Sequence, residues 1–305
     1  MTADYKTFRT YAEQVELLTC RGMEVADKGK AIEQLHHLNY YRLSGYWYPM
    51  REFRDGKAQD SFKPGASFEL VVKLYRFDEQ LRHLLFCELT GIELAIRALL
   101  GHELGRIDPY VHEILDQKSK LAKQPHPSEK NRTNFDVWKG TFDAAVKKSR
   151  EDFVKHHRYQ YAGRLPVWAA VEVMDWGMLS HLYRFSPRRA RDTVAQEAGL
   201  SAPQFESWMR SLNVLRNYAA HNARVFNRVF DMNPKESNRE ELRILNQTKS
   251  RFFGQATMVQ YLLRTLKISD GAALPNLLKA YPHNDLVPFS RTGAPEDWQL
   301  SSLWD

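Results

Sequence analysis

A short run of polar residues near position 220 has the types and spacing needed for proton transfer beside an anion. Arg216, Asn217 and His221 follow one another at helical steps, and Arg224 and Arg228 continue the series. A histidine side chain in water has a pKa of about 6.5, so it can accept or donate a proton near neutral pH. An arginine stays charged and can donate two hydrogen bonds to a phosphate. The sequence therefore predicts acid–base chemistry on a phosphate.

RNA suits these side chains because its own 2′-hydroxyl can act as the nucleophile. We expect His221 to take the 2′-proton and Arg216 to hold the non-bridging oxygens of the phosphorane, where charge grows. Asn217, one turn before the histidine, would orient the imidazole or bind a phosphate oxygen. Arg224 and Arg228 would contact further phosphates without reading the base sequence. Such a reaction leaves a 2′,3′-cyclic phosphate and a 5′-hydroxyl.

Helical geometry sets a condition on this site. On an ideal helix, Arg216 and His221 are about 140° apart around the axis and about 7.5 Å apart along it. They converge only because arginine is long, or because a second polypeptide surface completes the site. The alternative is that both side chains simply make hydrogen bonds between helices.

A second Arg-x4-His spacing occurs earlier in the chain. Arg97 and His102 repeat the pattern, and Glu93 precedes the arginine by one helical turn. Glu93 fits the role of an ion-pair partner that positions Arg97. These three residues form a candidate second active site, and the alternative is an ordinary ion pair on a helix.

An aromatic block near the start of the chain is a candidate for base stacking. Five aromatic residues and one arginine lie between residues 39 and 49. Aromatic rings alternating with a cation can stack unpaired bases, so Tyr40, Tyr41 and Arg42 are candidate RNA-binding residues. The same rings could instead form the packed core of a small helical unit.

Composition limits the class of protein. The chain has 305 residues, of which 43% are hydrophobic, and a net charge of +7 that favours a polyanionic partner. Its two cysteines lie in no metal-ligand pattern, and neither a Gly-rich phosphate loop nor an acidic metal cluster is evident. We expect no metal and no cofactor. With no signal peptide and no apolar run of membrane-spanning length, we expect a cytoplasmic protein that does not enter a membrane.

The sequence predicts that these residues are carried and surrounded by helices. Ser67 can cap a long helix that runs from Phe68 to about residue 104, with apolar residues at helical spacing. Further helices are expected over residues 134–157, as one central helix over 166–180, from residue 202 through the polar run to the break at Asn233-Pro234, and over 248–268. Turn signals at Arg54-Asp55-Gly56 and Lys63-Pro64-Gly65 bound a short connection.

These helices predict an all-α protein, since almost no alternating strand pattern occurs. We divide the chain into an N-terminal helical and aromatic unit (residues 1–60), a helical domain (61–270) and a C-terminal tail (271–305).

Several blocks resemble the Abi-like (AbiD/AbiF) abortive-infection proteins of bacteria. The blocks are Asn39-Tyr40-Tyr41-Arg42-Leu43-Ser44-Gly45-Tyr46-Trp47, Phe77-Asp78-Glu79-Gln80-Leu81-Arg82, Ile92-Glu93-Leu94-Ala95-Ile96-Arg97, Pro166-Val167-Trp168-Ala169-Ala170, and Arg216 to Arg228. They lie in the family's order over roughly residues 10 to 232. The last block also resembles the Arg-x4-6-His signature of HEPN ribonucleases. The resemblance implies a HEPN-like helical bundle with an N-terminal extension and a role in phage defence. Asn222 stands where the family often has a second histidine.

The sequence thus favours a metal-independent RNA endonuclease that acts as a growth-arresting or defence effector. The main alternative is a non-catalytic RNA-binding protein controlled by a structured RNA, and a DNA-binding regulator is the weaker third. Because the motif offers one histidine and the reaction uses two proton carriers, we expect a two-fold homodimer. The alternative is an internal site in which Arg97 and His102 face His221.

Overall fold

The computed structural model describes residues 6–305 and is mostly helical, with only one small two-stranded hairpin, which confirms the predicted all-α class. The first helices and strands are Tyr11–Cys20 (α1), Lys28–His37 (α2), Tyr40–Trp47 (α3), Arg51–Arg54 (β1), Lys57–Phe62 (β2), Phe68–Gly105 (α4), Leu115–Lys118 (α5), Lys120–Lys123 (α6), Asn134–Lys148 (α7) and Asp152–Gln160 (α8). The remaining ones are Val167–Ala170 (α9), Trp176–Phe185 (α10), Arg188–Glu197 (α11), Ala202–Ala220 (α12), Arg243–Thr248 (α13), Phe252–Thr265 (α14) and Ala273–Lys279 (α15).

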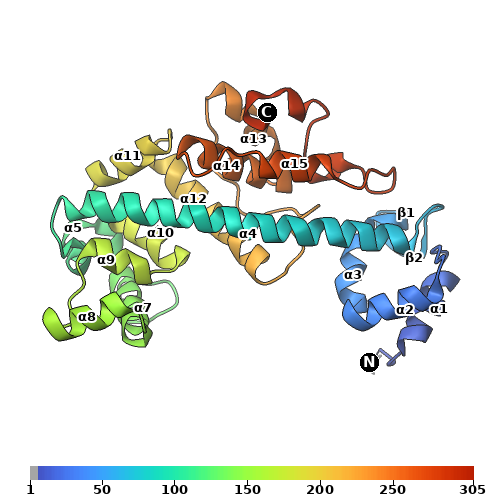
Figure 1. Ribbon diagram of the computed structural model, residues 1–305, viewed down its shortest axis with the longest axis horizontal. Coiled ribbons are helices and arrows are strands. Elements are labelled where there is room, and N and C mark those ends of the chain that lie inside the picture. The colour runs from blue at the N-terminus through green and yellow to red at the C-terminus, as the bar shows by residue number, and fades with distance from the viewer. Residues whose placement is uncertain (1–5) are drawn as a thin grey trace.

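Helix α4 is the element around which the others are arranged (Figure 1). It contains 38 residues and is therefore about 57 Å long. The Ser67 hydroxyl accepts a hydrogen bond from the Leu70 amide and caps its start, as the sequence predicts. The N-terminal unit lies at one end of α4 and helices α5 to α10 lie at the other, while α14 and α15 run beside its middle.

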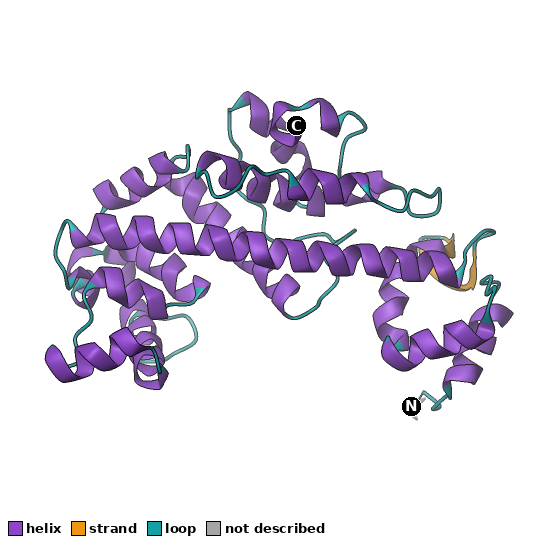
Figure 2. Cartoon of the chain, in the orientation of Figure 1, coloured by secondary structure: helices purple, strands orange, loops and turns teal. Residues whose placement is uncertain are grey.

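A small hairpin interrupts the helical N-terminal unit, and the sequence analysis did not predict its strands. Strands β1 and β2 pair antiparallel (Figure 2). Asp55 and Gly56 form the turn with positive φ angles of 50° and 73°. An Asp-Gly pair adopts this conformation readily, so the predicted turn is correct although its role as a hairpin was missed.

The region predicted as one helix over residues 166–180 is two helices instead. Helix α9 is followed by a 3₁₀ turn, and the Asp175 side chain then accepts a hydrogen bond from the Met178 amide to start α10. A side chain that bonds to the backbone in this way favours a new helix start over continuation. Helix α9 packs closely on α4 at Gly101, where an added Cβ would lie 3.1 Å from Cα of Trp168.

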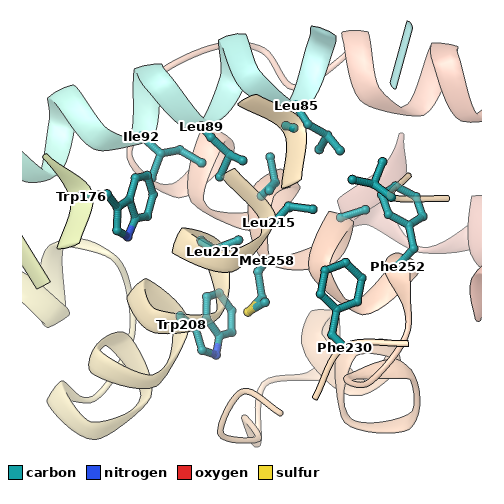
Figure 3. Packing of buried hydrophobic residues seen from close by; sticks show 14 of the residues in the cluster. Leu85, Leu89, Ile92, Trp176, Trp208, Leu212, Leu215, Phe230, Phe252 and Met258 are labelled. Atoms are coloured by element: carbon teal, nitrogen blue, oxygen red, sulfur yellow. The ribbon is translucent and has the colours of Figure 1, made fainter. Parts of the chain in front are cut away.

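Helix α12 crosses α4 and packs its apolar face against it. Leu212 and Leu215 of α12 lie beside Leu85, Leu89 and Ile92 of α4 (Figure 3). All five side chains are completely buried. This contact is formed by the apolar stripe that the sequence pattern predicts, and it fixes which face of α12 is left for polar residues.

Helix α12 ends at Ala220, well before the break at Asn233-Pro234 to which the sequence predicts it to run. Asn222 adopts a left-handed conformation with φ of 54°. The Asn222 amide then donates to the carbonyl of Ala219, and the Ala223 amide donates to that of Tyr218 at 2.9 Å. This arrangement terminates helices, and asparagine tolerates the left-handed conformation better than most residues. The prediction that the helix continues through Arg228 is therefore wrong.

The residues after α14 cover the core. Trp298 and Trp304 are buried, and the Trp304 ring stacks on Phe253 with centroids 4.8 Å apart. The buried apolar residues from the N-terminal unit to this tail form one continuous cluster, and the three-part division of the chain stays a prediction. Within residues 6–305, no helix is long and apolar enough to cross a membrane.

Candidate active site

Arg216 lies on the side of α12 that faces α4, beside a buried carboxylate. Its Nε atom is 3.9 Å from Oε2 of Glu93. The other oxygen of Glu93 accepts a hydrogen bond from Arg97 at 2.6 Å, and Arg97 also donates to the carbonyl of Met174 at 2.7 Å. We call Glu93, Arg97 and Arg216 the Glu93 cluster. It brings together the arginines of the two Arg-x4-His motifs.

The Glu93 cluster keeps unused hydrogen-bonding capacity on the Arg216 side. The Nε of Arg216 has no hydrogen-bond partner within residues 6–305. The Arg216 side chain is 30% exposed and its guanidinium carbon lies 5.8 Å from the centre of the Phe86 ring. Because that Nε is buried, an incoming anion can be bound only by the exposed part of the Arg216 guanidinium.

Asn217 and His221 lie at the solvent-exposed end of α12. His221 is the C-cap residue, and its amide donates to the Asn217 carbonyl at 3.0 Å. Both side chains are exposed, and neither makes a side-chain hydrogen bond to any of the described residues. The imidazole is therefore free to exchange protons with a ligand or with water.

The segment after His221 is fixed by a second cluster on α4, which the sequence analysis did not identify. Asp78 accepts hydrogen bonds from the amides of Val225 and Phe226, at 3.2 and 2.8 Å. Its second oxygen accepts from Arg82 and from the Tyr46 hydroxyl. We call Tyr46, Asp78 and Arg82 the Asp78 cluster.

The Asp78 cluster is almost completely removed from water. Asp78 is 0% exposed, Arg82 1% and Tyr46 2%. Burial raises the pKa of the Asp78 carboxyl, and the four hydrogen-bond donors around it oppose that shift. Burial likewise raises the pKa of the Tyr46 hydroxyl above its ordinary value. The one sequence signal for this cluster was an acid and an arginine four residues apart within an apolar helical stretch.

Two arginines, one from each side, connect the N-terminal unit to the same segment. Arg42 of α3 donates to the carbonyl of Asn222 at 2.7 Å, although the two residues are 180 positions apart. Arg224 donates to the carbonyl of Gly45 at 2.5 Å. Burial lowers the pKa of Arg224. The structure thus places the predicted RNA-binding residue Arg42 within one residue of the predicted catalytic His221.

The other predicted RNA-binding residues differ in exposure. Arg228 lies 4.1 Å from the centre of the Tyr218 ring and donates to the Arg224 carbonyl. Tyr41 is 63% exposed, whereas Tyr40 is half-buried against the Trp47 ring, with centroids 4.9 Å apart. Tyr40 therefore packs, whereas Tyr41 is exposed and has the Lys6 ammonium 5.1 Å from its ring centre. Base stacking by these rings stays a prediction.

His102 lies away from the rest of the motif. Between Arg216 and Phe226 the chain runs along α4 from Glu93 toward Asp78. His102 is exposed and is nine residues beyond Glu93 in the opposite direction, about 13 Å along the helix. The structure thus brings Glu93 and Arg97 to Arg216 but separates His102 from His221.

A metal site was not expected from the sequence, and the described part of the chain contains no group of three histidine, cysteine or acidic side chains arranged to hold an ion. What the described residues do contain is a helical scaffold. Its longest helix carries two ion pairs in which an acid precedes an arginine by four residues, and an Arg-Asn-x-x-x-His sequence lies at the end of the helix that crosses it. These features define a helical protein with a cationic, histidine-bearing site.

A match to a protein-family model identifies the family of this chain. The model described as Abi-like protein matches residues 33–227, and the chain belongs to this family. The match covers α3, α4, α12 and the segment that carries His221. No curated protein and no solved structure gives a significant match. Membership of the Abi-like family suggests a role in abortive infection, the defence of a bacterial population against phage.

Proposed function

We propose that this Abi-like protein is an RNA endonuclease of the HEPN type that arrests growth or defends against phage. The observation that carries the proposal is the pairing of Arg216, partly free beside Glu93, with the unbonded imidazole of His221 at the exposed end of the same helix. The net charge of +7 supports a polyanionic substrate.

The reaction needs no nucleophile from the protein. His221 accepts the proton of the 2′-hydroxyl while the 2′-oxygen attacks the adjacent phosphorus. Arg216 donates hydrogen bonds to the non-bridging oxygens, whose charge increases in the transition state. The bond from phosphorus to the 5′-oxygen breaks, and that oxygen takes a proton from a second carrier. Asn217 orients the imidazole or binds a phosphate oxygen, and Arg42 and Arg228 hold neighbouring phosphates.

The matched test replaces two exposed histidines in different places. His221→Ala should lower RNA cleavage by at least about 100-fold, which is the usual contribution of a general base. His156→Ala, on the exposed surface of α8, is the control and should cleave as the unmodified protein does. RNA whose 2′-hydroxyls are replaced by hydrogen should remain intact, and EDTA should leave the rate unchanged. Cleavage of the 2′-deoxy substrate, or loss of activity in EDTA, would rule out this mechanism.

The alternative function is RNA binding without cleavage, in which a structured RNA controls the protein. It is supported by the hydrogen bond of Arg42 near His221 and by the exposed ring of Tyr41. Under this alternative, His221→Ala changes little and Arg42→Ala lowers RNA affinity. Affinity and cleavage measured on the same two variants therefore separate the two functions.

We further propose that the nuclease acts as a two-fold dimer. One chain supplies one well-placed histidine, and the position of His102 beyond Glu93 gives no support to an internal pair. Two copies of the α12 end facing each other would supply two proton carriers and two Arg216 side chains. Light scattering combined with cleavage by His102→Ala tests this. A monomer that cleaves RNA and loses activity with that substitution would overturn the dimer.

A further inference from the structure

A hollow at the start of α11 gathers cationic side chains far from the candidate active site. It has a volume of about 330 Å³ and lies between the start of α6, the end of α10 and the first turns of α11 and α12. Four basic residues and one acidic residue line it: Lys120, Arg184, Arg188, Arg191 and Glu206. The four positive charges minus the one negative charge leave an excess of three.

A second hollow shows that such an excess is not general in this protein. The hollow beside His112, of about 210 Å³, is lined by two basic and two acidic residues. There Arg164 pairs with Glu113 at 2.7 Å and Lys139 pairs with Asp143 at 2.5 Å. Its charges balance within the lining, so it has no electrostatic preference for an anion. The hollow at α11 does have one.

Glu206 positions the arginines of the α11 hollow without neutralising them. It accepts a hydrogen bond from Arg184 at 3.1 Å and is 3.8 Å from Arg191. The Nε of Arg191 is buried and has no hydrogen-bond partner within residues 6–305. Arg188 is 90% exposed and lies 3.5 Å from Asp192, which is outside the lining. The donors that a ligand can reach are therefore the exposed parts of the Arg188 and Arg191 side chains, not that buried Nε.

The helix that begins at the hollow supports the same preference. No side chain caps the start of α11, where Pro187 is the N-cap residue. The first-turn amides of a helix have no acceptor within it, and they favour an anion. This adds to the charge of the arginines and does not replace it.

We propose that the hollow at α11 binds a phosphate group. Phosphate matches the lining because it carries up to two negative charges and several acceptor oxygens, which arginine forks can hold in pairs. The group can belong to an RNA backbone or to a free nucleotide, since a hollow of this size admits a small ligand.

The hollow is distinct from the proposed nuclease site. Glu206 and His221 are 15 residues apart, at opposite ends of α12, which corresponds to about 22 Å along the helix. Phosphate binding at α11 therefore does not depend on cleavage at His221. If the nuclease proposal fails, binding at α11 can still be measured.

Two neighbouring arginines provide a matched pair of variants. Arg188→Glu changes a residue that lines the hollow, while Arg189→Glu makes the same change of charge at the next residue, which is also exposed but does not line it. We expect Arg188→Glu to weaken the binding of inorganic pyrophosphate at least about 10-fold by calorimetry, and Arg189→Glu to weaken it less than about 3-fold. Arg191→Gln should act in the same direction as Arg188→Glu. Urea unfolding midpoints confirm that each variant is folded.

A labelled single-stranded RNA separates the two sources of phosphate. If pyrophosphate displaces the RNA and Arg188→Glu weakens RNA binding with a lower salt dependence, the hollow holds a backbone phosphate. If pyrophosphate binds but RNA affinity does not change in Arg188→Glu, the ligand is a free nucleotide or related phosphate. No measurable pyrophosphate binding, or equal weakening by Arg188→Glu and Arg189→Glu, would overturn the proposal.

Discussion

Helix α4 carries the same pair of residue types twice, and the two pairs have different environments. Asp78 and Arg82 are four residues apart, as are Glu93 and Arg97. The first pair is completely buried, whereas the Arg97 side chain is 17% exposed. One helical spacing therefore produces a sealed structural contact in one place and the edge of an open site in the other.

The two carboxylates differ in the number of hydrogen-bond donors around them. Asp78 receives donors from Arg82, Tyr46 and two backbone amides, so both of its oxygens are in use. Among residues 6–305, Glu93 has a close partner only in Arg97, and Arg216 approaches to 3.9 Å without a hydrogen bond. A fully bonded buried carboxylate fixes a structure, whereas a partly bonded one leaves an arginine able to bind something else.

The two clusters also contact different parts of the candidate active site. The Asp78 cluster fixes the segment just after His221, through Val225 and Phe226. The Glu93 cluster lies beside Arg216, five residues before His221. The backbone at His221 therefore lies between a segment that Asp78 fixes by hydrogen bonds and Arg216, which approaches Glu93 without one.

The largest expected effect comes from breaking the sealed pair. Asp78→Asn removes the charge that Arg82 and the loop amides require, and it leaves a buried arginine unpaired. We expect the free energy of unfolding in urea to fall by about 3–5 kcal/mol. Asp152→Asn, at a 99% exposed side chain, makes the same chemical change on the surface. It should cost less than about 0.5 kcal/mol, and equal losses in the two variants would refute the contrast.

A third buried ionisable group, His112, sharpens the comparison because it has no charged hydrogen-bond partner. His112 is 1% exposed and its Nδ1 has no hydrogen bond to the described residues. Burial lowers the pKa of His112 to about 4. The unfolded chain therefore binds a proton at higher pH than the folded protein does. The contribution of neutral His112 to the free energy of unfolding is therefore fully present above about pH 6.5. It is lost as the pH decreases toward 4, by up to about 3 kcal/mol.

Unfolding measured across this pH range, with His112→Gln as the comparison, isolates that contribution. The variant should lose less stability between pH 6.5 and pH 4, because glutamine does not titrate. If the free energy of unfolding falls equally in the two proteins between pH 6.5 and pH 4, His112 does not cause the expected loss of stability.

The smallest expected effect on stability comes from the open pair. Glu93→Gln keeps the size of the side chain, and Arg97 retains the carbonyl of Met174 as an acceptor. We expect a loss of about 1–2 kcal/mol in urea unfolding, together with a roughly 10-fold lower cleavage rate because Arg216 loses its charged neighbour.

Glu172→Gln is the matched control for the open pair, since Glu172 lies 3.7 Å from Arg97 and is 46% exposed. It should change stability by less than about 0.5 kcal/mol. A loss for Glu93→Gln as large as that for Asp78→Asn would mean that the two acid–arginine pairs are equivalent after all.

The helical class and the start of α4 could be predicted from the sequence, as could the residues that the family resemblance emphasises. Capping by Ser67 and the apolar spacing along α4 depend on residues a few positions apart, so the local pattern contains what is needed. The Abi-like blocks were likewise visible as short strings, and the family match over residues 33–227 agrees with them.

How these short segments combine could not be predicted in the same way, because it depends on contacts between distant parts of the chain. The end of α12 depends on the left-handed Asn222, and the apolar spacing continues past it because Phe226 and Phe230 are buried without being helical. The approach of Arg216 to Glu93 and the bond from Arg42 to the Asn222 carbonyl join residues more than one hundred positions apart. Such contacts depend on how whole helices pack, and a local pattern of residue types does not specify that packing.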